Sequence, residues 1–230
     1  MQIHLADAWI YFCVSFGIML ITTFIMDRLS RHFYTQDVVL RRFSIMDLEW
    51  PASPRELVNL VKGMYELPVQ KQHKAISSLR KHLYTDFIFM PAAYGSIFLL
   101  CMNISWKMTF IGPYIFAALA WLQVIAFLLD VIENVYLLNK IRPDIVEEPL
   151  TTHKNFEKLE YVKWGIALVA PICALSALLY FWLVGRYAVG SLKYAGIVVI
   201  EIVLFFVAGK IMAKFIRTVN ADTDKPETAA

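Results

Sequence analysis

Five long apolar stretches divide the sequence and set its predicted architecture; they lie at residues 9–26, 87–106, 113–138, 164–184 and 194–212. A helix needs roughly 20 predominantly apolar residues to cross the hydrocarbon core of a bilayer. The charged residues gather between the stretches, as expected because hydrocarbon excludes them. The pattern therefore predicts an all-α, polytopic membrane bundle of five transmembrane helices forming a single membrane domain. No lysine or arginine precedes the first stretch, so we expect a retained helix and not a signal peptide.

The positive charges are distributed unevenly between the two sides that five spans define. Of the 22 lysines and arginines, 19 fall in or beside the segments after the first, third and fifth stretches. Lys107, Arg186 and Lys193 are the only three on the other side. The positive-inside rule then predicts an N-terminus outside and a C-terminus in the cytoplasm.

Residues 27–86 are predicted to form a cytoplasmic helical insertion. Ser53-Pro54-Arg55-Glu56 is typical of a helix start, and apolar residues follow it at helical spacing up to about Leu67-Pro68. The apolar face of this helix needs a partner, which could be the membrane surface, the rest of the insertion or a second protein. A second helix, 69–84, should run on into the second span. Rough alternation over 43–50 favours an extended stretch, and the polar tail 220–230 is expected to be disordered.

Composition agrees with a membrane protein and excludes several function classes. Hydrophobic residues make up 59% and aromatic residues 14% of the 230 residues, more than a soluble core of that size needs. A net charge of +3 gives no support for nucleic-acid binding. The three cysteines lie in separate apolar stretches and the five histidines lie outside them, so we expect no disulfide framework, metal site or other cofactor. No recognised enzyme motif is present, and enzymatic activity stays an open question.

Ionisable residues inside a span are costly and are functional candidates for that reason. Asp130, Glu133 and Asn134 share one face of the third predicted helix, roughly 9 to 15 Å from its cytoplasmic end. Asp86 and Tyr94 of the second helix should lie at a similar level, because a short connection makes helices two and three antiparallel neighbours. Two carboxylates this close should not both ionise without a cation, so one is protonated or paired with Arg or Lys.

These five residues are binding or proton-relay candidates in a pocket open to the cytoplasm, and Thr85 could converge on the same pocket. No catalytic residue is assigned. The alternative is structural, since an Asp beside a helix start complements the helix dipole and Glu–Asn pairs join helices. Glu201 in the fifth helix is a further candidate nearer the middle of the bilayer. It could be protonated and hydrogen-bonded to a neighbouring helix, or it could relay protons.

Three short motifs together resemble a set of small multi-pass bacterial membrane proteins of unassigned function. They are Asp47-Leu48-Glu49, then Thr85-Asp86-Phe87 with Pro91 and Tyr94, then Asp130-x-x-Glu133-Asn134. The resemblance covers about residues 43–138. It implies a multi-pass protein of the bacterial inner membrane and implies no activity.

Three functions remain open on the sequence. The leading one is a transport-type protein that binds a proton, cation or polar solute in the carboxylate pocket. The second is an interfacial enzyme acting on lipid or isoprenoid head groups. The third is an accessory or assembly subunit of a membrane complex, and a homo-oligomer or complex partner is compatible with all three.

Overall fold

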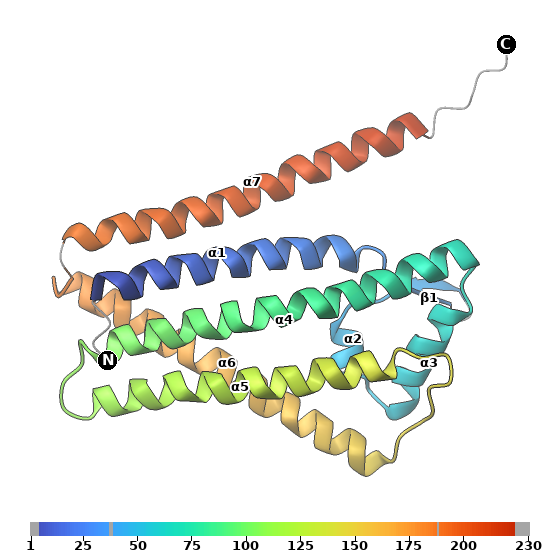
Figure 1. The fold of residues 1–230 in the computed structure, drawn as a ribbon, viewed down its shortest axis with the longest axis horizontal. Coiled ribbons are helices and arrows are strands. Elements are labelled where there is room, and N and C mark those ends of the chain that lie inside the picture. The colour runs from blue at the N-terminus through green and yellow to red at the C-terminus, as the bar shows by residue number, and fades with distance from the viewer. Residues whose placement is uncertain (1–4, 37–38, 188, 224–230) are drawn as a thin grey trace.

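The computed structural model describes residues 5–36, 39–187 and 189–223, with side chains described over 8–213 of those ranges, and this part of the chain is almost entirely helical (Figure 1). Five of its helices are long and apolar enough to cross a membrane. They are α1 (Leu5–Ser30), α4 (Val69–Ser105), α5 (Gly112–Lys140), α6 (Leu150–Leu183) and α7 (Leu192–Thr223). The structure thus confirms the prediction of five long apolar helices.

The long helices run side by side, with α4 in contact with α1, α5 and α6 and with α7 contacting α1 (Figure 1). The α4–α5 hairpin is closed by a hydrogen bond of 2.8 Å that Ser105 Oγ donates to the Pro113 carbonyl oxygen. Pro113 lies at the start of α5, where its missing N–H costs no helical hydrogen bond. Large apolar side chains on α6 and α7 are exposed, as expected for surfaces that face lipid.

Most of the lysines and arginines lie at one end of the bundle, here called the basic end, where α1, α5 and α7 finish and α4 and α6 begin. A small domain covers this end. It contains an antiparallel pair of strands, β1 (Tyr34–Gln36) and β2 (Leu40–Arg42), followed by α2 (Met46–Glu49) and α3 (Pro54–Tyr65). The predicted helix start is confirmed, because Ser53 Oγ accepts a hydrogen bond of 3.2 Å from the Glu56 backbone N–H.

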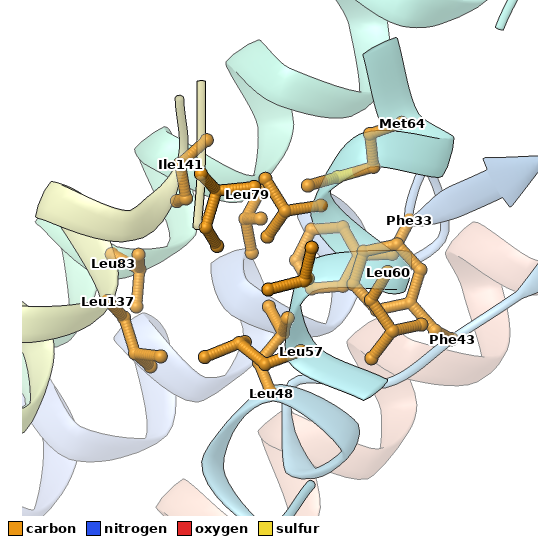
Figure 2. Packing of buried hydrophobic residues seen from close by; sticks show 13 residues of the cluster. Phe33, Phe43, Leu48, Leu57, Leu60, Met64, Leu79, Leu83, Leu137 and Ile141 are labelled. Carbon is orange, nitrogen blue, oxygen red and sulfur yellow. The ribbon is translucent and has the colours of Figure 1, made fainter. Parts of the chain in front are cut away.

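The chain itself covers the apolar face of α3 (Figure 2). Leu57, Leu60 and Met64 of α3 are buried in one cluster with residues from the strand segment, α2, α4 and α5. That cluster comprises Phe33, Phe43, Leu48, Leu57, Val58, Leu60, Val61, Met64, Leu79, Leu83, Leu137, Ile141 and Ile145. The sequence left three partners open for this apolar face: the membrane surface, the rest of the insertion or a second protein. The structure covers it with the rest of the insertion and with the ends of α4 and α5. Burying so many large apolar side chains anchors the domain to the bundle.

The α5–α6 connection is also fixed to the basic end. The Ile141 carbonyl oxygen accepts hydrogen bonds from Tyr65 Oη at 3.2 Å and from Arg80 at 3.1 Å. Tyr136 Oη donates a hydrogen bond of 2.7 Å to Glu148 Oε2, and Glu148 also forms an ion pair with Lys140. These contacts determine where α6 begins, and therefore which of its residues face α5.

Several predicted boundaries differ from the structure. The predicted helix 69–84 does continue into the second span as one helix, α4. The expected extended stretch 43–50 is wrong in its second half, because Met46–Glu49 is helical. Helix α6 begins at Leu150, well before the apolar stretch at 164–184. Helix α7 extends to Thr223, into the tail expected to be disordered, and residues 224–230 lie outside the described part.

Candidate functional site

A buried lysine is the centre of the candidate site. Lys163 of α6 has a side chain that is 4% exposed, and its ammonium contacts carboxylates of two helices. It donates hydrogen bonds to Asp130 Oδ1 at 3.2 Å and to Glu133 Oε2 on α5. It also lies 2.8 Å from Glu160 Oε2, one turn earlier on α6. The side chains of Glu133 and Glu160 are each 2% exposed, so these charges interact in a low dielectric.

Helix α4 supplies a second group of polar partners to the same face of α5. Tyr94 Oη donates a hydrogen bond of 3.0 Å to Asp130 Oδ2, the oxygen that Lys163 does not contact. Asn134 Nδ2 donates 2.6 Å to Asp86 Oδ2 and 3.5 Å to the Leu83 carbonyl oxygen. The i, i+3 and i+4 positions on α5 thus contact partners on both α4 and α6, as their common helix face requires.

Glu49 enters the site from the small basic-end domain. Glu49 is the last residue of α2. Asp47 fixes the first turn of this helix, because its Oδ2 accepts hydrogen bonds from the Ser44 backbone N–H at 2.7 Å and from the Ser44 hydroxyl at 3.0 Å. Leu48, 1% exposed, inserts into the apolar cluster beneath. Trp50 contacts Tyr161 of α6 edge-on, with ring centroids 4.6 Å apart. These neighbours direct Glu49 towards Glu133 and Glu160, and the three carboxylates offer oxygens within 4.8 Å of one another.

Part of this polar network lines a cleft of about 580 Å³ between α1, α4 and α6, and that part of the lining is here called its floor. Glu49, Asp86, Asp130, Asn134 and Lys163 are polar residues of this lining. Its rim at the basic end includes the exposed residues Asp27, Ser44 and Met46. The walls are mainly apolar, with Met19 and Met26 of α1, Phe89, Ala93 and Ile97 of α4 and Ala167 of α6. This combination suits a small molecule or ion that enters from the basic end.

Carboxyl groups outnumber cationic side chains in this site. Among the residues described around the cleft, Lys163 is the one lysine or arginine, and it contacts three carboxylates. Burial raises the pKa of Glu49 above its ordinary value, the charge on Lys163 lowers it, and Asp130 raises it further. Buried carboxylates that outnumber their cations must bind protons or a further cation to remain in a low dielectric.

Glu201 lies apart from this network, on α7 against α1. A Cβ added to Gly17 would lie 3.0 Å from Glu201 Oε1, so the missing side chain at Gly17 makes room for the carboxylate. A second cavity, of about 350 Å³ and mostly apolar, lies between α1, α6 and α7 towards the opposite end. Its lining includes Trp9 and Phe12 of α1, whereas the first cleft begins at Met19. Along α1, Glu201 is therefore placed between the two cavities.

The structure brings together Asp86, Tyr94, Asp130, Glu133 and Asn134, all of which the sequence pointed to, and leaves Glu201 separate. Thr85, also considered for the pocket, instead donates a hydrogen bond of 2.8 Å from its hydroxyl to the Lys81 carbonyl oxygen of its own helix.

Sequence reasoning missed Lys163, Glu160 and Glu49. Lys163 and Glu160 precede the apolar stretch of α6 and were counted with the cytoplasmic segment, and Glu49 lies in a short insertion helix. The available signal was the expectation that one of the paired carboxylates on α5 is protonated or paired with Arg or Lys.

No protein-family model, curated protein or solved structure matches the chain.

Proposed function

We propose that the protein is a transport-type membrane protein that binds a proton, a cation or a positively charged polar solute at the carboxylate floor of the cleft. Placing the basic end in the cytoplasm follows the positive-inside rule, and the bacterial inner membrane follows the resemblance of the sequence motifs. The observation that carries the proposal is the surplus of buried carboxylates over the single ammonium of Lys163. Such a site attracts positive charge and holds it in exchange for protons.

The order of features along α1 supports transport over simple binding. The carboxylate-floored cleft begins at Met19, Glu201 faces Gly17, and the apolar cavity includes Trp9 and Phe12. At about 1.5 Å per residue, Gly17 lies roughly 3 Å along the axis from Met19 and roughly 8 Å from Phe12. An acidic side chain at this depth can accept a proton or cation between the two hollow regions.

Flux measurements on reconstituted protein test this proposal. Proteoliposomes enclosing a pH-sensitive dye are given a membrane potential, or an inward gradient of sodium, potassium or choline chloride. We expect the wild-type protein to carry proton flux under at least one of these gradients. Asp130→Asn and Glu201→Gln should abolish that flux at unchanged incorporation, while Asp144→Asn, a change in the exposed connection before α6, should leave it intact.

Absence of any gradient-driven proton flux in the wild-type protein would overturn the proposal. Equal flux in wild type and Asp130→Asn would overturn the role of the cleft. Monodisperse elution in detergent and equal abundance in the membrane separate loss of function from loss of folded protein.

A second function, binding or turnover of an amphiphilic molecule, is favoured by the apolar walls above the polar floor. Mass spectrometry of the purified protein would then find an amphiphile that Ala93→Phe, which fills the cleft, removes. The third function, an assembly subunit, has lost its main support, because the apolar face of α3 is buried within the chain itself.

A further inference from the structure

We infer that Glu49, Glu133 and Glu160 form a binding site for one divalent metal ion of the oxygen-preferring class, Mg²⁺, Mn²⁺ or Ca²⁺, and that the Lys163 ammonium competes with the ion for these carboxylates. This inference goes beyond cation transport. The site lies where α2, α5 and α6 meet, and Glu49 connects it to the cleft. It can hold a resident ion whether or not anything is transported.

The spacing of the carboxylates is that of ligands around a divalent ion. The three oxygens, one each from α2, α5 and α6, lie within 4.8 Å of one another. Oxygen ligands lie about 2.1 Å from Mg²⁺ and about 2.3–2.6 Å from Ca²⁺, so ligands on opposite sides of the ion are roughly 4–5 Å apart. Three carboxylates with this spacing can reach one ion with side-chain adjustments only.

A buried oxygen with no donor is the second, independent observation. Glu133 is 2% exposed, and its Oε1 accepts no hydrogen bond from any described residue, although Oε2 is bonded to Lys163. Leaving a buried carboxylate oxygen without a partner is costly. A metal ion bound by the three glutamates would supply the missing positive partner.

Charge balance argues for a divalent ion over a second monovalent one. When all three glutamates are ionised, they and the one ammonium carry a net charge of about −2, before Asp130 is counted. A divalent ion neutralises that charge and can contact all three glutamate oxygens at once. The Lys163 ammonium has only three N–H donors and uses one of them on Asp130, so it cannot contact all three glutamates as well.

Access to the ion is provided from the basic end. Glu49 lines both the main cleft and a smaller depression of about 150 Å³ that also includes Trp50, His153 and Glu157. An ion can therefore reach Glu49 from the water-facing surface without crossing the apolar walls. Glu147 is exposed in the connection before α6 and lines neither the cleft nor this depression, which makes it a matched control for the ligand glutamates.

The experiment measures Mn²⁺ binding to the full-length protein purified in detergent and stripped with a chelator. Electron paramagnetic resonance reports the free ion, and thermal unfolding reports stabilisation by Mn²⁺, Mg²⁺ and Ca²⁺ separately. We expect about one Mn²⁺ per chain, at least tenfold weaker binding in Glu49→Gln, and unchanged binding in Glu147→Gln. Lys163→Met should bind Mn²⁺ at least tenfold more tightly, because the competing ammonium is removed.

Wild-type protein that binds no stoichiometric Mn²⁺ at millimolar concentration overturns the inference, and so does equal binding by Glu49→Gln and Glu147→Gln. Unchanged or weaker binding in a folded Lys163→Met protein overturns the competition between ammonium and metal. Should Lys163→Met fail to fold without metal, Mn²⁺ must restore its folding if the inference is correct. The assay involves no transport, so this inference and the proposed function can fail separately.

Discussion

The buried ammonium of Lys163 gives the sharpest prediction about stability. Replacing it by Met keeps most of the aliphatic volume and removes only the charge, so loss of packing contributes little. The side chains of Lys163, Glu133 and Glu160 are all at most 4% exposed. Removing one partner of a buried ion pair costs about 3–5 kcal/mol, because the remaining charge is left uncompensated. We expect a destabilisation of that size at neutral pH in a buffer containing chelator.

The measurement is thermal unfolding in detergent, followed by intrinsic fluorescence. In a chain of this length, about 1 kcal/mol corresponds to a change of about 2–4 °C in Tm, so Lys163→Met should lower Tm by about 6–20 °C. Lys158→Met, an exposed substitution on the same helix, should leave Tm within about 2 °C of wild type. Adding Glu133→Gln to Lys163→Met should recover part of the loss, since one uncompensated carboxylate disappears. A Lys163→Met protein as stable as Lys158→Met would refute the view that the lysine neutralises this cluster.

Two further predictions concern the basic-end domain. Because burial raises the pKa of Glu49, the folded protein binds a proton there more readily than the unfolded chain does, and wild-type stability should fall as pH rises through the folded-state pKa. Glu49→Gln should therefore be more stable than wild type at pH 8 in chelator. The two proteins should be equally stable below about pH 4, where Glu49 is protonated in both the folded and the unfolded state. Chemical denaturation at the two pH values checks this, and a stability difference that does not change with pH would contradict it. At Gly63, an added Cβ would overlap Thr35 Oγ1 and the Gln36 carbonyl oxygen, so Gly63→Ala should lower the free energy of unfolding by about 1–3 kcal/mol. A Cβ added to Gly165 would meet nothing within 4 Å, so the control Gly165→Ala should not destabilise the protein. Equal unfolding temperatures for the two glycine variants would refute the close approach of β1 to α3.

Hydrophobic patterning predicts the long helices well because the lipid requirement is strict over some 20 residues. It predicts their ends poorly, because a helix that leaves the membrane continues wherever capping and packing allow. Helix α6 shows the consequence: Leu150 begins it, but the apolar stretch begins only at 164, so Lys163 was counted with the cytoplasmic segment. The partner of α3 was equally undetermined, since an amphipathic helix has the same pattern whether lipid or protein covers it.

The acidic half of the site follows from helical periodicity, because Asp130, Glu133 and Asn134 share a face by their spacing alone. Which cation neutralises them depends on how α6 is oriented against α5, and that in turn depends on the α5–α6 connection fixed by Tyr65, Arg80 and Tyr136. These are long-range contacts between segments with no common sequence pattern. Physical chemistry therefore predicted that one carboxylate carries a proton or pairs with a cation, and only the fold identified Lys163 as that cation.

Three adjacent residues of the insertion, Asp47, Leu48 and Glu49, connect the basic-end domain to the candidate site. Asp47 fixes the turn through Ser44, Leu48 is buried in the apolar cluster, and Glu49 reaches Glu133 and Glu160. Because Leu48 is held within a core that also contains Leu83 and Leu137, the position of Glu49 is tied to the packing of α4 against α5. A cation that changes the charge around Glu49 therefore acts on a residue whose neighbour is part of the domain core. Binding at the cleft floor and stability of the basic-end domain must then be thermodynamically linked, each altering the other by the same free energy.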